Sequence, residues 1–184
     1  MKIVFLDIDG VVNHRGYLGR GERKDPPTEA EAEIAPRIRD AVSWECYRLD
    51  SVMLDLRSID PTRVVLVQQL IAMTGAKVVI SSSWRHGQTV EGMRLLLAHH
   101  GLDAESVIGM TPTTVLLPDG KIAERGHEIQ AWLDAHPDVE SFVILDDDRD
   151  MAHLSDRHVK TDNHVGITPD NVQAAGVILD CPLR

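Results

Sequence analysis

The sequence predicts an α/β protein built on a doubly wound parallel sheet, with a small cap-like insertion. Short apolar runs alternate along the chain with longer segments of helical periodicity, and this alternation is typical of parallel βαβ units. Two of the apolar runs stop at clusters of aspartate, as strands do where their carboxyl ends line a ligand crevice. A chain of 184 residues has about the length of one such domain, so we expect a single domain over residues 1–184.

Continuous apolar runs are the strongest strand candidates. They occur at residues 2–6 (KIVFL), 77–80 (KVVI) and 141–145 (SFVIL). Runs without polar alternation are typical of parallel strands that helices cover on both faces. A weaker run at residues 158–161 (HVKT) predicts a further strand near the C-terminus.

A well-marked helix is predicted at residues 61–74, directly before the second strand. Apolar residues recur there with helical spacing, and Asp60 precedes Pro61, an order typical of an N-cap and a first helical turn. Gly75 then ends the pattern, as glycine does after many helices. Two other helices are expected, at residues 89–100 before Gly101 and at residues 126–135 before His136 and Pro137.

Residues 13–58 do not follow this alternation. The segment is rich in Gly, Arg, Glu and Pro at first and mixed in character afterwards, so we interpret it as an insertion that covers the crevice. Residues 111–121 (TPTTVLLPDGK), with an Asp119 and Gly120 turn signal, predict a surface loop or hairpin.

The composition is that of an ordinary globular protein, and it argues against some partners. Apolar residues make up 43% and charged residues 26% of the chain, with a formal net charge of −10. Broad adhesion to nucleic acid or anionic membranes requires clustered cations and is not expected. No apolar run approaches the ~20 residues of a membrane span, so we expect a cytoplasmic protein without membrane contact. Cys46 and Cys181 lie far apart in sequence and are expected to be reduced thiols.

One local segment runs against the overall charge. Residues 14–24 (HRGYLGRGERK) carry Arg15, Arg20, Arg23 and Lys24 directly after the first aspartate cluster. Such a segment is suited to a phosphate chain, and it is also compatible with a solvated loop.

The first aspartate cluster follows the first predicted strand. Asp7 and Asp9 lie two positions apart, so an extended backbone points both carboxylates the same way, and Gly10 lets the chain turn after them. Close carboxylates repel each other unless a proton or a cation intervenes, and a hard cation prefers oxygen ligands.

The second aspartate cluster follows the run at residues 141–145. It comprises Asp146, Asp147, Asp148 and Asp150. Alone, this cluster is also compatible with a helix N-cap surrounded by exposed acids. Together with the first cluster it predicts a shared divalent metal, although the sequence does not say which of Asp146, Asp147 and Asp148 binds it.

Hydroxyl groups and a cation complete the expected site. Residues 81–85 (SSSWR) follow another predicted strand, and hydroxyl and backbone N–H groups in that position are suited to phosphate oxygens. Arg125 starts the helical segment before the second aspartate cluster, where a guanidinium can clamp a phosphate. Trp84 lies beside the expected site, but the sequence alone does not favour a stacking role for it.

In this order, these elements resemble the haloacid dehalogenase (HAD) superfamily of phosphatases. DIDGV resembles its motif I, a serine after KVVI its motif II, Arg125 its motif III and ILDDD its motif IV, over residues 3–150. More narrowly, DIDGVV, DPTRVVLVQQLIAMTGAKVVISSSWR, RGHEIQAWL, VILDDDRDM and the tail VKTDNHVGITPDNVQAAGVIL resemble the HAD domain of Swiss army knife RNA-repair proteins. The resemblance implies a HAD-like Rossmannoid fold in which residues 13–58 form a small cap that sets substrate choice.

The resemblance also implies the reaction. Asp7 attacks the substrate phosphorus and forms an aspartyl-phosphate, while Asp9 protonates the leaving oxygen and later activates water. Mg²⁺ is expected to be bound by Asp7, the Asp9 backbone carbonyl, Asp146 and Asp147.

Further residues are expected to hold the phosphoryl group or the substrate. Ser81 hydrogen-bonds the phosphoryl group, unless a shift by one residue gives that role to Ser82. Gly10, Ser82 and Arg85 are expected to contact the substrate. Many relatives have a lysine where this chain has Arg125. Arginine keeps the positive charge but presents it on a planar guanidinium instead of a compact ammonium group.

These roles predict a Mg²⁺-dependent phosphomonoester hydrolase. The aspartate at position 9 favours a phosphatase over a dehalogenase, and a small cap leaves the crevice open to nucleotides or polynucleotide ends. Two alternatives remain from the sequence: a phosphatase of small metabolites or mononucleotides, and a non-catalytic module that binds a phosphorylated partner.

Overall fold

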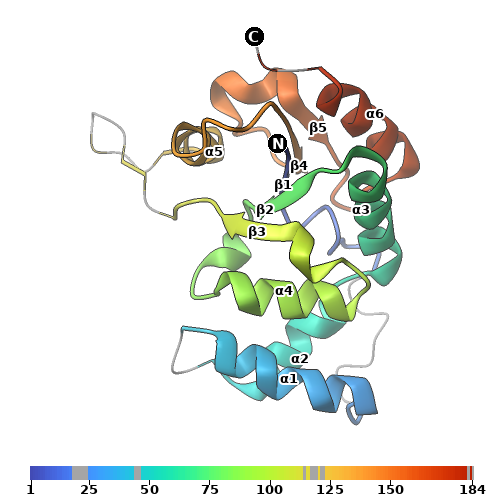
Figure 1. Ribbon diagram of the computed structural model, residues 1–184. Helices are drawn as coiled ribbons and strands as arrows, with labels where there is room; N and C mark the ends of the chain where they lie inside the picture. The colour runs from blue at the N-terminus through green and yellow to red at the C-terminus, as the bar shows by residue number, and fades with distance from the viewer. Residues whose placement is uncertain are drawn as a thin grey trace.

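A parallel sheet forms the centre of the molecule (Figure 1). The computed structural model describes residues 1–17, 25–43, 47–113, 115–116, 120, 123–181 and 183. In this part of the chain the sheet has five strands in the order β3-β2-β1-β4-β5, so β1 is central. The strands are β1 (Lys2–Leu6), β2 (Lys77–Ile80), β3 (Val107–Met110), β4 (Ser141–Asp146) and β5 (His158–Lys160).

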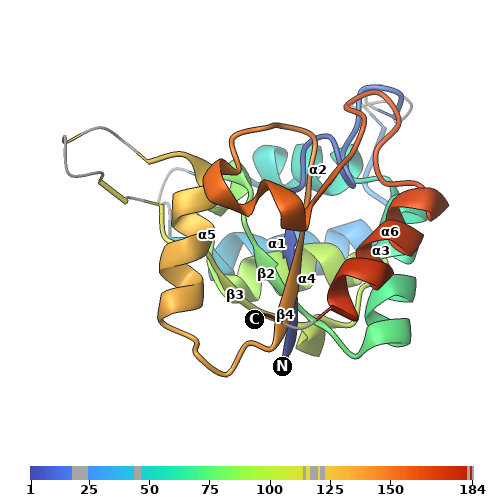
Figure 2. The ribbon, with the colours of Figure 1, turned by 90° about the horizontal axis from the view of Figure 1, so that it is seen from above.

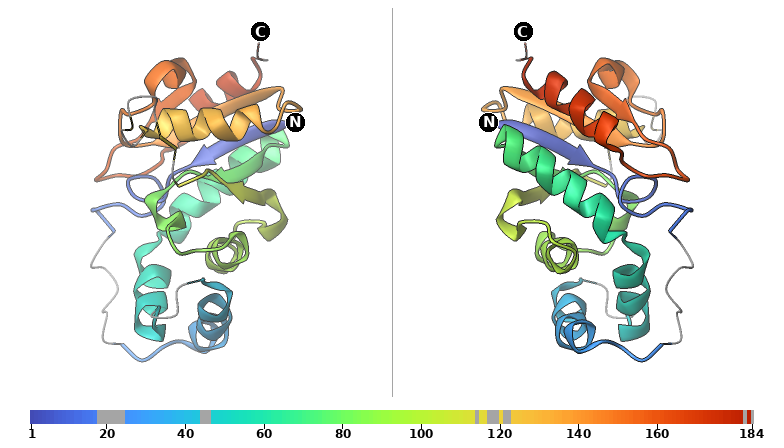
Figure 3. Two further views of the ribbon diagram at one scale, coloured as in Figure 1. Left: turned by 90° about the vertical axis from the view of Figure 1, so that its left-hand side faces the viewer. Right: turned by 90° about the vertical axis from the view of Figure 1, so that its right-hand side faces the viewer.

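Alternate residues of the strands face two different helical layers. Val4 and Leu6 of β1 belong to the same core cluster as residues of α3, α4 and α6. Ile3 and Phe5 pack with residues of α5 on the other face (Figure 3). This two-sided burial explains why the strand runs are continuously apolar. The helices are α3 (Pro61–Thr74), α4 (Val90–His99), α5 (Arg125–Asp134) and α6 (Pro169–Leu179).

The residues that bound α3 show how local chemistry sets its ends. The Asp60 carboxylate accepts a hydrogen bond from Thr62 N at 2.9 Å and caps the helix, and Pro61 occupies the first turn. Gly75 ends the helix in the left-handed region, with φ at 69°, which glycine adopts without steric cost. The predicted bounds of this helix are therefore confirmed.

Two helices inside residues 13–58 form a further layer outside α4. They are α1 (Glu29–Ala41) and α2 (Leu49–Ser58), and α1 packs against both α4 and α2. Figures 1 and 3 show this pair on the far side of α4 from the sheet. Ile38 and Leu56 bury their side chains in the larger core cluster. We call α1 and α2 the outer helices; their action as a cap stays a prediction.

Most predicted elements are confirmed with small changes at their ends. The strands at residues 2–6 and 77–80 match, the strand at 141–145 extends to Asp146, and the last strand ends at Lys160. The predicted helices at 89–100 and 126–135 are α4 and α5, shifted by one residue at one or both ends. The sequence analysis missed β3, α1, α2 and α6.

Several sequence features fall outside the described residues. They are Arg20, Arg23, Lys24, Cys46, Asp119 and other parts of the predicted loop at residues 111–121. Cys181 is an exposed free thiol. Among the described residues, no helix has both the length and the apolar character needed to cross a bilayer.

Candidate active site

The candidate site lies at the edge of the sheet where the strands end. Asp7 N donates to Leu145 O at 3.0 Å, and Ser81 N donates to Leu6 O at 2.9 Å. Strand pairing therefore continues one residue beyond β1 and β2, which fixes the backbone of Asp7 and Ser81 side by side. Figure 2 shows the N-terminus at the lower edge of the sheet and the loops that follow β1 and β4 at the upper edge.

Three carboxylates converge at this edge. Asp7, Asp146 and Asp147 each offer an oxygen, and these atoms all lie within 4.8 Å of one another. Asp7 is 5% exposed and Asp146 is fully buried. Burial raises the pKa of Asp7, and burial together with the charge of Asp7 raises the pKa of Asp146 to about 7. The fold thus holds negative charge where it is costly.

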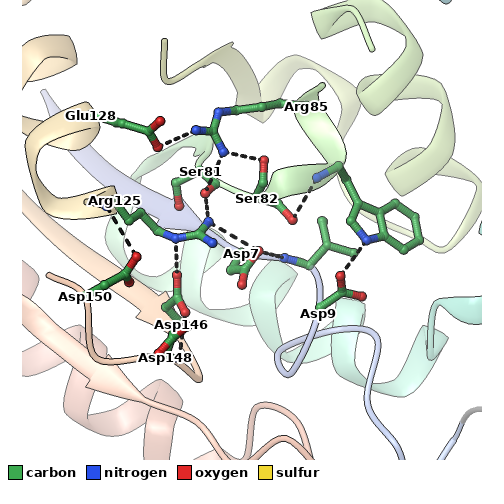
Figure 4. Close-up of polar contacts among 12 residues, drawn as sticks. Asp7, Asp9, Ser81, Ser82, Arg85, Arg125, Glu128, Asp146, Asp148 and Asp150 are labelled. Atoms are coloured by element: carbon green, nitrogen blue, oxygen red, sulfur yellow. Dashed lines mark hydrogen bonds and ion pairs between the residues drawn. The ribbon is translucent and has the colours of Figure 1, made fainter. Parts of the chain in front are cut away.

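Arg125, the first residue of α5, compensates part of this charge. Its Nη1 lies 3.6 Å from Asp7 Oδ1, and its Nε lies 3.1 Å from Asp146 Oδ2 (Figure 4). It also donates to the Ser81 carbonyl. Burial works against the guanidinium charge, but Asp7 and Asp146 outweigh it and raise the pKa of Arg125. One guanidinium among three carboxylates leaves the cluster acidic.

The cluster fits a hard divalent cation such as Mg²⁺. Asp146 Oδ2 and Ser81 Oγ are buried and have no hydrogen-bond partner among the described residues, and carboxylate oxygens are ligands that Mg²⁺ prefers. Gly10 makes room for Asp147: its φ is 72°, and a Cβ there would lie 2.1 Å from Asp147 Cγ. Asn163 Nδ2 donates to Asp147 Oδ2 at 2.8 Å and fixes that side chain.

Asp148 does not belong to the carboxylate cluster. Its side chain is exposed, and its backbone N–H donates to Asp146 Oδ1 at 2.8 Å. Of the residues between which the sequence did not decide, the geometry therefore favours Asp146 and Asp147 as metal ligands.

Asp9 also lies apart from the cluster. Its Oδ2 accepts a hydrogen bond from Trp84 Nε1 at 2.9 Å, and its Oδ1 accepts one from Asn13 Nδ2 at 2.5 Å. Figure 4 shows the Asp9 side chain turned away from Asp146. The expectation that Asp7 and Asp9 point the same way assumed an extended backbone. The chain instead turns at once, with Val11 N, Val12 N and Asn13 N all donating to Ile8 O.

The site is an open rim with small hollows beside it. One hollow of about 180 Å³ is lined by Asp9, Gly10, Asn13, His14, Arg15 and Asn163. A separate hollow of about 810 Å³ is lined by Leu133, His136 and Phe142 among others. It lies towards the start of β4, away from the site, and contains none of the predicted site residues.

A family comparison now agrees with this geometry. The model of the family described as "HAD domain in Swiss Army Knife RNA repair proteins" matches residues 3–172. The chain belongs to this family. The expected superfamily and fold are thereby confirmed, and the family supports a HAD-type phosphatase. No curated protein and no solved structure matches the chain.

The serines of this HAD domain differ in their surroundings. Ser81 and Ser82 are both fully buried. Ser82 Oγ accepts a hydrogen bond from Trp84 N at 3.3 Å, and its hydroxyl hydrogen bonds to Asp7, which lowers the pKa of that carboxyl against the larger effect of burial. Ser81 Oγ has no partner in the described part of the chain. It is therefore the hydroxyl left to meet a ligand.

Arg85, which was expected to contact the substrate, contacts other parts of the protein instead. Its guanidinium is buried and donates to the carbonyls of Ser81, Ser82 and Pro112 at 3.2, 2.6 and 3.3 Å. It also forms an ion pair with Glu128 of α5. In this geometry Arg85 holds the turn after β2 in place through Nη1 and Nη2, and only its buried Nε has no partner among the described residues. A substrate contact by Arg85 stays a prediction.

The sequence analysis missed the supporting roles of three residues, of which it had named only Asp150, as a member of the second aspartate cluster. Glu128 pairs with Arg85, and Asn163 fixes Asp147. Asp150 Oδ2 accepts a hydrogen bond from Arg125 N at 3.4 Å at the start of α5. A signal existed only for Glu128, which lies three positions after Arg125 and so on the same helix face.

The backbone of α5 comes very close to the loop after β4. Gly126 N donates to Asp150 O at 3.0 Å, and a Cβ on Gly126 would lie 2.2 Å from Met151 O. This close approach places Arg125, the residue before Gly126, against Asp146.

Proposed function

We propose that this HAD domain is a Mg²⁺-dependent phosphomonoester hydrolase that works through an aspartyl-phosphate on Asp7. The observation that carries the proposal is the cluster of buried Asp7 and Asp146 with half-buried Asp147, which Arg125 compensates only in part. Asp7, Asp146 and Asp147 would hold the ion, together with the Asp9 carbonyl. When bound, Mg²⁺ supplies positive charge that makes attack by a carboxylate on a phosphate anion tolerable.

The first chemical step uses Asp7 and Asp9. A carboxylate oxygen of Asp7 forms a bond to phosphorus while the bond from phosphorus to the leaving oxygen breaks. Asp9 gives its proton to that leaving oxygen. Trp84 and Asn13 hold the Asp9 carboxylate in place for this transfer. Arg125 and Ser81 Oγ stabilise the charge on the phosphoryl oxygens.

The second step reverses the proton transfer. The Asp9 carboxylate takes a proton from water, the water oxygen attacks phosphorus, and the bond to Asp7 breaks to release inorganic phosphate. Both steps share the same phosphoryl contacts, so one arrangement of residues serves both.

Phosphate release from p-nitrophenyl phosphate tests this proposal. We expect Mg²⁺-dependent release that EDTA abolishes and that Asp7→Asn reduces by at least about 10³-fold, since the nucleophile is lost. Asp148→Asn is the matched control: it makes the same change at an exposed neighbour of the cluster and should leave turnover within about twofold. No release by the wild type, or equal release by Asp7→Asn, would contradict the proposal.

For the substrate, we propose nucleotides or polynucleotide ends. Support comes from the family description, which refers to RNA repair, and from the open rim beside Asp9. Comparing turnover of oligonucleotide 3′- and 5′-phosphates with that of sugar phosphates tests it. A preference for sugar phosphates would assign the domain to small metabolites instead.

A further inference from the structure

A hollow of about 250 Å³ lies next to the Asp9 carboxylate. Trp84 connects the two, because it lines the hollow and also donates from Nε1 to Asp9 Oδ2 at 2.9 Å. Another wall is formed by Asp55 of α2, by Val42 directly after α1 and by Tyr47 shortly before α2. The catalytic proposal above does not use this hollow.

The hollow lies where the leaving group of the proposed reaction would extend. In the proposed reaction Asp9 protonates the leaving oxygen, so the body of the leaving group must extend past Asp9. Trp84, which donates to Asp9, lines the hollow. Burial raises the pKa of Asp55, and the negative charge of Asp9 raises it further. The effect of that charge indicates that Asp55 lies near Asp9. A ligand that reaches from Asp9 into the hollow therefore meets Asp55.

The walls of the hollow suit a flat ring. Trp84 and Tyr47 contribute aromatic side chains and Val42 an aliphatic one. Aromatic side chains of this kind stack on nucleobases. Pockets for drug-sized ligands are roughly 300–1,000 Å³, so a volume of about 250 Å³ fits a single small ring system rather than a large ligand.

The polar groups of the hollow specify donors on the ligand. The Tyr47 hydroxyl donates to Asp55 Oδ2, whereas Asp55 Oδ1 has no donor among the described residues and is not sealed in the core. A carboxylate oxygen accepts hydrogen bonds from N–H groups, such as the exocyclic amino groups of adenine, cytosine and guanine. No described lining residue is Lys or Arg, which argues against a second phosphate in the hollow.

We propose that this hollow binds the base of a nucleotide whose phosphate is hydrolysed at Asp7, with Trp84 and Tyr47 against the ring and Asp55 accepting from its amino group. The inference rests on the proposed function and narrows it, since it makes the leaving group a nucleoside. It also assigns substrate choice to the outer helices, which carry Asp55.

Turnover of adenosine monophosphates against a base-free substrate tests the proposal. We expect kcat/KM for the better of 3′-AMP and 5′-AMP to exceed that for ribose 5-phosphate. Asp55→Asn should lower this ratio about tenfold, the effect of losing one hydrogen bond to a charged group. Asp50→Asn, an exposed site on the same helix, should leave the ratio unchanged. An oligoribonucleotide ending in a phosphorylated adenosine distinguishes an RNA end from a free nucleotide, and preference for either over ribose 5-phosphate supports the base site.

A binding measurement keeps the inference separate from the proposed function. Calorimetric titration with adenosine should show binding to the wild type and weaker binding to Asp55→Asn and Tyr47→Phe, with no binding of ribose. Turnover without preference for adenosine substrates, together with no adenosine binding, would overturn the base site and leave the phosphatase proposal standing. Adenosine binding without turnover of any substrate would support the base site and contradict the phosphatase proposal.

Discussion

Buried charge is handled in opposite ways at the rim of the sheet and in the outer helices. In the outer helices Glu31 and Arg57 match one to one: Arg57 Nε lies 2.9 Å from Glu31 Oε1, and its Nη2 lies 3.0 Å from Oε2. This hydrogen bonding from Arg57 lowers the pKa of Glu31 to about 2. At the rim, burial raises the pKa of Asp7 and Asp146 instead.

The difference separates a structural pair from a site prepared for a ligand. A matched pair lowers the energy of the folded state by itself, within the modest limits of a partly exposed contact. Excess buried carboxylates raise that energy until a cation arrives. The rim therefore carries a cost that a bound cation or a proton can offset, and charge variants at the two places should change stability in opposite directions.

Removing the positive charge of Arg125 at the rim should have the largest effect on turnover. Arg125→Gln is expected to lower kcat on p-nitrophenyl phosphate by about 10²–10³-fold, because a donor to the phosphoryl oxygens is lost. Arg125→Lys keeps the charge without the planar fork and should lose less. Steady-state kinetics of the two variants check the order. If glutamine and lysine behave alike, the charge of Arg125 does not act on the reaction.

Removing one carboxylate of the rim should stabilise the metal-free protein. In EDTA at pH 8 we expect Asp146→Asn to exceed the wild type in free energy of unfolding by about 2 kcal/mol, since a poorly compensated buried charge is gone. Asp148→Asn serves as the control. Urea titrations measure the difference, and a destabilised Asp146→Asn would show that Arg125 already balances the cluster.

The sign of the pH dependence follows from the same carboxyl. The folded-state pKa of Asp146 is raised from 3.8 to about 7, so its contribution makes the metal-free protein less stable as pH rises between these values. Mg²⁺ needs the ionised form and must displace a proton below about pH 7. The rise in melting temperature on adding Mg²⁺ should thus be larger at pH 8 than at pH 5.5, and Asp146→Asn should remove most of it.

Breaking the matched pair of the outer helices should have the smallest effect, with the opposite sign. Glu31→Gln is expected to lower the free energy of unfolding by about 1 kcal/mol at pH 7. Because the pKa of Glu31 is lowered from 4.5 to about 2, its contribution is present above pH 4.5 and is lost as pH falls towards 2. Urea titrations at pH 7 and pH 3 measure it. Turnover of p-nitrophenyl phosphate should stay within about twofold.

The predictable part of the fold is the part that local chemistry determines. Continuous apolar runs located β1, β2 and β4, and the order of Asp60, Pro61 and Gly75 located α3. β3 was missed because only the first residue of its VIGM sequence is buried, unlike the KVVI run of the same length in β2. α1 was missed because Pro36, a residue that usually breaks a helix, lies inside it, although Ile34, Ala35 and Ile38 form an apolar stripe.

The site residues also fall into those that the local sequence predicts and those that depend on contacts between distant segments. Asp7, Asp146 and Arg125 were predictable because each lies next to an element that the sequence indicates. The direction of the Asp9 carboxylate was not, since it depends on Trp84 from another loop. The place of Tyr47 and Asp55 beside Trp84 depends on how α2 packs, and no local pattern records that.

In the proposed mechanism, Trp84 links recognition of the leaving group to delivery of the proton. The indole that borders the hollow also donates to Asp9, so any molecule that shifts the ring on entering shifts the acid as well. Contacts that change on the way to the transition state alter the rate rather than the affinity. If the proposed mechanism holds, the domain would discriminate between competing phosphate esters through how fast it turns them over, even where it binds them equally tightly.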